Sequence, residues 1–343
     1  YDLRTYLHDD LVAMDSISPQ QFWTIQLLEA NRRLAVPGAA GTGKTLIATK
    51  LAADAAASGK RALLICYNAP LAQFLQSRIG GDENLMIVTF AGFCRGLNKG
   101  ELLEEDKLAE QLLEDLSNNE RERFDIVVVD EGQDFRDDWL QALELALRDG
   151  NSSSFCVFFD DNQQVRGQSR VYIREMKAST IPLTVNFRNT QEVFNLSQKY
   201  YSGSNVSAIG PKGVDVVWKS AGDIDVARKN LREHLGQLIT GSRIEPERIA
   251  VLCHTKAAAE KLIKAGRFGK MEVSSAFDRK NGAVIFDSIR RFKGLESDVV
   301  VCFWPDDYLD DYELIYVVAS RARALLVVIG SQQAINLLHP RDK

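Results

Sequence analysis

The sequence contains 343 residues, of which 45% are hydrophobic and 26% charged, and its formal net charge is −5 at pH 7. These values are typical of a globular protein long enough for two domains, and the acidic balance argues against a broadly basic protein that coats nucleic acid. No apolar run approaches the roughly 20 residues of a membrane helix. The first residues lack the basic and apolar regions of a signal peptide, so we expect a cytoplasmic protein with no membrane partner.

The cysteines and histidines give no indication of a metal site. The five cysteines are Cys66, Cys94, Cys156, Cys253 and Cys302. They are scattered, form no CxxC pair and lie mostly in apolar runs, so we expect reduced cysteines in the core. The four histidines show no ligand spacing, which argues against a zinc site.

Short apolar runs alternate with helical stretches, which predicts parallel α/β sheets. In the first half we expect strands at Arg33–Val36, Ala62–Cys66, Met86–Thr89, Ile126–Asp130 and Phe155–Asp160, and a helix at Lys44–Ser58. In the second half we expect strands at Val214–Trp218, Arg248–Cys253, Ala283–Phe286, Asp298–Phe303 and Leu325–Ile329, and helices at Ile224–Leu238, Lys256–Ala265 and Tyr312–Ser320. The acidic segment Glu101–Arg123 is expected to form one or two solvated helices, and Ser202–Ser207 a loop. We therefore predict two α/β domains, residues 1–180 and 181–343, each a mainly parallel sheet flanked by helices.

A glycine-rich loop lies between the first expected strand and the helix that follows it. Its residues are Gly38, Ala39, Ala40, Gly41, Thr42, Gly43, Lys44 and Thr45, which match GxxxxGK[ST]. Such a loop wraps backbone N–H groups around phosphates at a helix N-terminus. Lys44 would contact the β- and γ-phosphates, and the Thr45 hydroxyl would coordinate Mg²⁺. The motif predicts a P-loop that binds ATP with Mg²⁺.

The expected strand Ile126–Asp130 ends in two carboxylates. Its four apolar residues suit a strand buried on both faces of a parallel sheet, and ligands bind at the carboxyl ends of such strands. We expect Asp130 to hold the Mg²⁺ shell and Glu131 to activate the attacking water as a general base.

The residues that follow resemble those of superfamily 1 helicases of the UvrD/Rep/PcrA type. The run Asp130–Asp134 is DEGQD, and that family has DEAQD. The resemblance covers nearly the whole chain and implies two RecA-like P-loop NTPase domains. Upstream, Ser18–Gln21 resembles the Q motif, in which Gln21 would contact adenine. Phe159–Gln163 resembles motif III, in which Gln163 would sense the γ-phosphate.

In the second half the resemblance supplies further nucleotide contacts. Asn186–Asn189 resembles motif IV, with Phe187 stacking on adenine and Arg188 contacting the γ-phosphate. The KGLE core of motif V is intact, and its Glu296 would bind the ribose. The segment Tyr316–Ala322 resembles motif VI, so Arg321 would be the arginine finger. Because a guanidinium binds phosphate in a bidentate way, both arginines suit stabilisation of the γ-phosphate.

The same resemblance implies a path for a single strand. The residues implied are Tyr67 and Asn68 of motif Ia, Thr89 and Phe90 of the Thr-Phe motif, and Ser288 and Arg290 of motif V. Arg290 stands where the family usually has histidine. The stacking Tyr and Trp that follow motif III in the family are replaced by Val165–Gln168. Five aromatic residues either replace that stacking or belong to the core, namely Tyr67, Phe90, Phe93, Tyr172 and Trp304.

The large helical insertions of the family are reduced or missing in this chain, because the segments between Phe90 and Ile126 and between Arg188 and Val284 are short. The compact form resembles helicase-like modules linked to a nuclease domain in bacteria. Two hypotheses follow. The first is a Mg²⁺-dependent ATPase coupled to single-stranded nucleic acid, with DNA favoured and RNA open, acting by translocation, unwinding or remodelling. The second is an ATP-driven switch that regulates a nuclease or another protein partner without moving on a strand.

Overall fold

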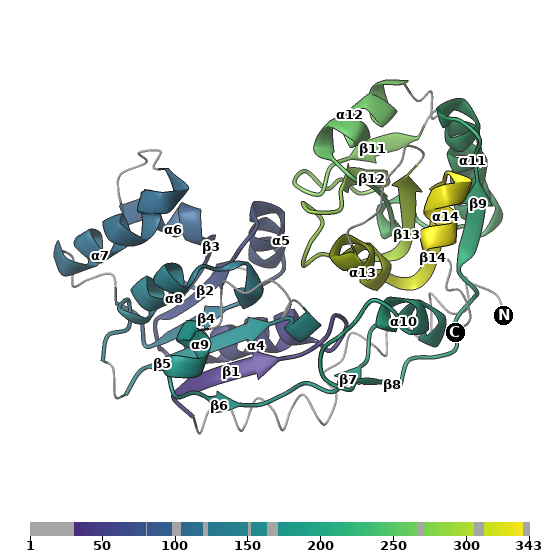
Figure 1. Cartoon of the computed structure of the whole chain (residues 1–343). Coiled ribbons are helices and arrows are strands. Elements are labelled where there is room, and N and C mark those ends of the chain that lie inside the picture. Colours follow the sequence, from purple (N-terminus) through teal and green to yellow (C-terminus); the bar gives the residue numbers. More distant parts are fainter. Residues whose placement is uncertain are drawn as a thin grey trace. The chain divides into compact units, whose positions relative to one another are not determined.

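The computed structural model describes residues 31–79, 81–97, 104–118, 123–149, 152–162, 171–265, 271–304 and 312–338 (Figure 1). Within them the chain divides into two compact units. The N-terminal unit runs to Thr184 and includes Gly203–Asn205, and the C-terminal unit comprises Val185–Ser202 and the chain from Val206. Two residues assigned to ATP from the sequence, Gln21 and Gln163, lie outside the described residues, as does Val165–Gln168.

The N-terminal unit contains a six-stranded parallel sheet in the order β3-β2-β4-β5-β1-β6. Its strands are β1 (Arg33–Pro37), β2 (Ala62–Cys66), β3 (Leu85–Thr89), β4 (Ile126–Val129), β5 (Ser154–Phe159) and β6 (Ser179–Thr180). Its α-helices are α4 (Lys44–Ala57), α5 (Ala69–Ile79), α6 (Phe90–Leu97), α7 (Leu108–Asn118), α8 (Asp137–Glu144) and α9 (Val171–Glu175). Short 3₁₀ turns occupy Glu105–Lys107 and Gly132–Asp134.

Helices cover both faces of this sheet (Figure 1). Val127 and Val129 of β4 lie in one core cluster with side chains from α6, α7, α8 and α9. Val128 between them is fully buried, and because side chains alternate along a strand it faces the other side, where α4 contacts the sheet. The all-apolar strand therefore has the two buried faces expected of a central parallel strand.

The C-terminal unit contains a second six-stranded parallel sheet in the order β11-β12-β10-β13-β14-β9. Its strands are β9 (Val217–Ser220), β10 (Ile249–Cys253), β11 (Glu272–Ser274), β12 (Ala283–Ser288), β13 (Ser297–Trp304) and β14 (Ala322–Gly330), and a separate pair joins β7 (Val185–Asn186) to β8 (Ser207–Ala208). Its helices are α10 (Gln191–Gln198), α11 (Ile224–Gly236), α12 (Lys256–Ala265), α13 (Tyr312–Ser320) and α14 (Gln332–Leu338), with a π-helical turn at Gln237–Gly241 and a 3₁₀ turn at Pro246–Arg248. One core cluster combines α11 and α12 with the sheet.

The predicted α/β class with two mainly parallel sheets is confirmed. The strand Ala62–Cys66 and the helices Lys256–Ala265 and Tyr312–Ser320 have the predicted bounds. The acidic segment differs from expectation, because α7 is not simply solvated. Its Leu112 and Leu116 are 0% and 2% exposed and belong to the core of the N-terminal unit. Its charged side chains cover only the outer face of an amphipathic helix.

All five cysteines are free and buried, as expected from the sequence. None of the helices in the described ranges combines the length and apolar character that crossing a bilayer requires.

His234 gives the C-terminal unit a predictable sensitivity to acid. It lies on α11, is 8% exposed, and its pKa is lowered to about 4, chiefly by burial and next by Lys219, with Gln237 opposing the shift. In the unfolded chain the imidazole of His234 binds a proton with the ordinary pKa of 6.5. The contribution of the neutral, buried imidazole to stability is therefore fully present above pH 6.5 and is lost as pH falls towards 4. When the pH is lowered from 7 to 4.5, we expect the free energy of unfolding in urea to fall less for His234→Leu than for the wild type. A difference between the two proteins that does not change with pH would contradict this.

Candidate nucleotide and nucleic-acid site

Three adjacent strands of the N-terminal sheet deliver the predicted catalytic residues to one edge. In the order β4-β5-β1, β4 ends before Asp130, β5 ends before Asp160, and β1 leads into the P-loop. The Gly38 N–H donates to the Phe159 carbonyl at 3.1 Å, and the Asp130 N–H donates to the Ile65 carbonyl at 2.9 Å. Because all strands are parallel, their carboxyl ends meet here, as ligand sites in such sheets do.

The P-loop has the backbone that its glycines predict. Gly41 and Gly43 have φ of 77° and 89°, which only glycine adopts without strain. A Cβ on Gly38 would lie 2.8 Å from Thr42 Oγ1 and 3.0 Å from Leu183 Cβ, so a side chain there would collide with the loop. The Thr42 hydroxyl donates to the Ala39 carbonyl at 2.8 Å. The loop is therefore a tight turn held by its own backbone.

Lys44 lies inside this turn. Its Nζ donates to the carbonyls of Gly38 and Ala39 at 2.7 and 2.9 Å and lies 3.8 Å from Asp160 Oδ2. Helix α4 begins at Lys44, directly after its N-cap residue Gly43, and no side-chain hydrogen bond caps its N-terminus. The N–H groups at the start of a helix carry partial positive charge and bind phosphate, so the first turn of α4 is suited to this role.

Asp130 is a fully buried carboxylate at the end of β4. Neither of its oxygens has a hydrogen bond in the structure, although the Thr45 hydroxyl and Lys44 lie close enough to affect its titration. Burial, and next the charge of Glu131, raise its pKa to about 7, and Thr45 and Lys44 oppose the rise. A buried acidic group without a partner is costly. A cation bound by Asp130 and Thr45 would remove that cost, so these residues fit the predicted Mg²⁺ ligands.

Glu131 is fixed by an unusual backbone and by Gln133. Its φ is 56°, in the left-handed region, and it is 6% exposed. Gln133 Nε2 donates to Glu131 Oε2, and Gln133 Oε1 accepts from the Asp160 N–H at 2.9 Å. Gln133 thus links the expected general base to the end of the neighbouring strand. No role is predicted for Gln133 from the sequence alone, although its place in the DEGQD run was a signal.

Motif IV, the end of motif V and motif VI meet at the amino edge of the C-terminal sheet. Arg188 Nη1 pairs with Glu296 Oε2 at 2.9 Å. Burial raises the pKa of Glu296, but Arg188, Arg323 and Arg321 outweigh it and the net pKa is lowered. Arg321 is 7% exposed and donates to the Val317 carbonyl at 3.2 Å. The ribose and γ-phosphate residues implied by the resemblance therefore form one charged cluster in this unit, with the half-buried Phe187 beside Arg188 in sequence.

Four of the predicted nucleic-acid residues have local structural roles. Asn68 Oδ1 accepts from the Leu71 N–H at 2.8 Å, and Thr89 Oγ1 accepts from the Gly92 N–H at 3.0 Å, so they act as N-caps of α5 and α6. Ser288 is 4% exposed and lies at the end of β12, where its Oγ is 3.4 Å from the Arg291 N–H. Phe90 is 2% exposed and its ring stacks on Trp139, so it packs in the core and offers no face to a base. Their strand contacts, and those of Tyr67 and Arg290, stay predictions.

The other stacking candidates are either buried in the core or exposed to solvent. Phe93, Tyr172 and Trp304 are 3%, 7% and 2% exposed, so each belongs to the core in the described structure. Tyr67 is 44% exposed and contacts Phe135 edge to face. Only Tyr67 of the five candidates presents much of its ring to solvent.

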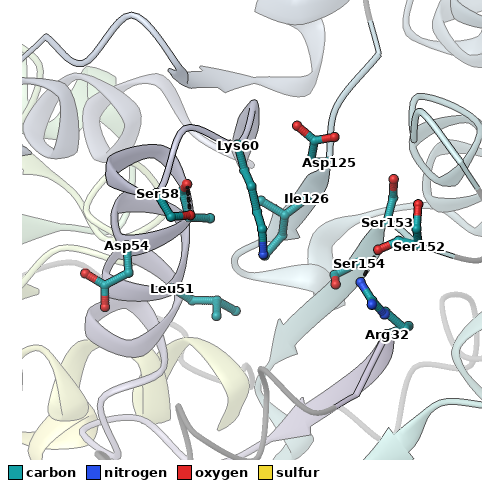
Figure 2. Close-up of a pocket in the computed structure, with 11 residues that line it drawn as sticks. Arg32, Leu51, Asp54, Ser58, Lys60, Asp125, Ile126, Ser152, Ser153 and Ser154 are labelled. Atoms are coloured by element: carbon teal, nitrogen blue, oxygen red, sulfur yellow. Dashed lines mark hydrogen bonds between the residues drawn. The ribbon is translucent and has the colours of Figure 1, made fainter.

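A separate cavity of about 470 Å³ lies at the opposite edge of the N-terminal sheet. Figure 2 shows Arg32, Lys60 and Ser152–Ser154 around it. Its two acids already have cationic partners, since Asp54 pairs with Lys50, and Asp125 with Arg148 at 2.9 Å. This edge carries the amino ends of the strands, where parallel sheets rarely bind ligands, and none of the predicted catalytic residues lines the cavity.

The fold and the site define a P-loop protein of superfamily 1 helicase type. A family profile, "Schlafen group 3, DNA/RNA helicase domain", matches residues 32–209, more than half of the sequence. The chain belongs to this family. The profile of the UvrD-like helicase C-terminal domain matches residues 283–329, which include Ser288, Glu296 and Arg321.

Two solved structures are similar to the chain at low sequence identity. The structure of PRRSV helicase is 11% identical, with a TM-score of 0.48, over 92% of this chain and 56% of that one. The complex of Arterivirus nonstructural protein 10 (helicase) with DNA is 15% identical, with a TM-score of 0.45, over 95% of this chain and 67% of that one. The chain thus spans little more than half the length of the first of these proteins.

Gly132 gives a direct test of the packing behind Glu131. A Cβ at this position would lie 2.5 Å from Val157 Cγ1 and 3.2 Å from the Phe158 carbonyl oxygen. We therefore expect Gly132→Ala, which supplies the alanine of the DEAQD box, to cost about 1–3 kcal/mol of stability through overpacking. Gly236→Ala is the matched control, because a Cβ there meets nothing within 4 Å. Thermal unfolding that shows equal stability for the two variants would contradict this account.

Asp130→Asn tests the buried carboxylate. Since the folded-state pKa of Asp130 is about 7 and the ordinary value is 3.8, its charge destabilises the folded state above pH 7, and this cost fades as pH falls towards 4. We expect Asp130→Asn to be more stable than the wild type at pH 8 by up to about 4 kcal/mol. The gain should shrink at pH 5. A loss of stability at pH 8 in chemical unfolding would show that Asp130 is a structural residue.

Proposed function

We propose that the chain is a Mg²⁺-dependent ATPase that couples hydrolysis to single-stranded nucleic acid, with DNA as the expected strand. The observation that carries the proposal is the fully buried Asp130 carboxylate, whose pKa burial raises to about 7 and which lies next to Thr45 and Lys44 of the P-loop. Membership of a DNA/RNA helicase domain family supports the coupling to nucleic acid.

The roles of the residues follow from their chemistry. Asp130 and Thr45 would hold Mg²⁺, which neutralises phosphate charge when bound. Lys44 and the N-terminus of α4 would bind the β- and γ-phosphates. Glu131, oriented by Gln133, would accept the proton of the attacking water, and its carboxylate is suited to this because it is held in a buried position.

The C-terminal unit would contribute positive charge. Arg188 and Arg321 would stabilise the charge that develops on the γ-phosphate, and Glu296 would bind the ribose. The ion pair between Arg188 and Glu296 pre-orients both side chains. Nucleotide binding would then compete with or rearrange this pair, which offers a way to couple the nucleotide state to the C-terminal unit.

The decisive measurement is the steady-state ATPase rate with and without single-stranded DNA, at low and moderate salt. We expect stimulation by DNA that weakens as salt rises, because phosphate contacts release counterions. Glu131→Gln should lower the rate by about 100-fold or more, since a general base contributes roughly 10²–10⁴-fold. Glu233→Gln is the matched control, because it removes a carboxylate from the exposed face of α11.

The outcomes separate the two functional hypotheses. A rate abolished by Glu131→Gln but indifferent to DNA and RNA would overturn coupling to nucleic acid and favour an ATP-driven switch that acts on a protein partner. A rate unaffected by Glu131→Gln would overturn the assignment of the catalytic base.

A further inference from the structure

The carboxyl edge of the C-terminal sheet brings together residues from four adjacent strands. The neighbours are β11, β12, β10 and β13, and all are parallel. The segments that leave them therefore emerge side by side at one edge. With about 4.8 Å between neighbouring strands, the row extends about 14 Å.

The segment after β11 presents an aromatic ring to solvent. Phe277 is 48% exposed, yet its loop is firmly held. The Ala276 N–H donates to the buried Asp287 Oδ2 at 2.9 Å, and the Asp278 N–H donates to Ser275 Oγ at 3.1 Å. An exposed phenylalanine on an anchored loop has no packing role that explains it.

The next strand places motif V beside this loop. Arg279 lies over the ring of Phe292, with 5.5 Å from the guanidinium carbon to the ring centroid. Arg290 is exposed at the turn after β12. The Ile289 N–H donates to the Cys253 carbonyl at 2.9 Å, which ties this turn to the end of β10.

The end of β10 supplies a second exposed ring. His254 is exposed, and its other face stacks on Trp304 at the end of β13, with centroids 5.5 Å apart and planes inclined by 21°. Both rings border a cavity of about 230 Å³ that Arg228 and Lys261 also line. Trp304 is 2% exposed, so it supports the imidazole from behind and leaves the outer face of His254 to a ligand.

Among the residues that the structure describes at this edge, cationic side chains outnumber acidic ones, although the whole chain is acidic. Among the described residues, the cationic side chains near the row are Arg228, Lys261, Arg290, Arg291 and Lys293. Three described acids near the row have cationic partners: Asp225 pairs with Arg228 at 3.1 Å, Asp278 with Lys280 at 3.6 Å, and Asp287 lies 3.5 Å from Arg291. Stacking rings between cations are the usual means of holding a single strand without reading its sequence.

We propose that Phe277 and His254 are base-stacking contacts for a single strand of nucleic acid that crosses this edge, with Arg290 holding phosphate between them. The row is as long as about four stacked nucleotides at 3.4 Å each. The inference rests on the proposed coupling to single-stranded nucleic acid and assigns the stacking residues that the sequence after motif III lacks.

The test measures how tightly the full chain binds a fluorescein-labelled oligodeoxythymidylate of about 16 nucleotides. Binding is monitored by fluorescence anisotropy at several salt concentrations. We expect Phe277→Ala and His254→Ala each to weaken binding about fivefold or more, with an unchanged slope of log affinity against log salt. Arg290→Ala should instead lower that slope by about one, because it removes a phosphate contact.

Two further variants serve as controls. Phe277→Tyr keeps the stacking face and should bind within about twofold of the wild type. Val226→Ala removes a side chain of comparable exposure, 41%, from α11 of the same unit and should have no effect.

The outcomes distinguish this inference from the proposed function. Wild-type binding and DNA-stimulated ATPase, with Phe277→Ala and His254→Ala both unchanged in affinity, would overturn the stacking contacts alone. Wild-type affinity in only one of the two variants would overturn the assignment of that residue. No binding of the oligonucleotide by the wild-type chain would overturn the proposed function and this inference with it.

Discussion

The burial of both faces of each parallel sheet is the constraint on which the sites depend. Strand β4 shows it most clearly, because its four residues Ile126–Val129 are all buried and can carry no chemistry. Polar groups must therefore appear where strands end, and parallel strands end at one edge. Asp130 and Asp160 follow their strands at the same edge as the P-loop for this reason. The cost of burying the Asp130 carboxylate would be offset by the cation that we propose for this site.

The same constraint holds at both edges of the sheet in the C-terminal unit. Its amino edge holds Glu296, paired with Arg188, and Arg321 just before β14. Its carboxyl edge holds Arg290 and the exposed rings of Phe277 and His254. Strand β13 joins the two edges, since it begins directly after Glu296 and ends at Trp304 beneath His254, a length of about 23 Å for its eight residues.

Much of the fold was predictable because its signals are local. Apolar runs such as Ala62–Cys66 and Ala283–Phe286 can be buried only as strands between helices, and the P-loop motif needs only its own glycines. The short helices α6 and α10 were not predicted, because eight residues hold too little periodicity to separate a helix from a loop. In α7 the acidic residues suggested solvent on all sides, whereas Leu112 and Leu116 are buried once α8 packs against them.

The sequence by itself determined the class of protein, because the P-loop, the DEGQD run and the later motifs are short contiguous signals whose chemistry depends on neighbouring residues. Only the tertiary structure decided how distant residues act together. Gln133 became a link between Glu131 and Asp160, Gly132 proved to be enclosed by Val157, and Phe90 proved to be buried against Trp139. The row from Phe277 to His254 likewise exists only because the strand order places β12 between β11 and β10. Sequence carries spacing along the chain, whereas strand order and burial depend on contacts between residues far apart in it.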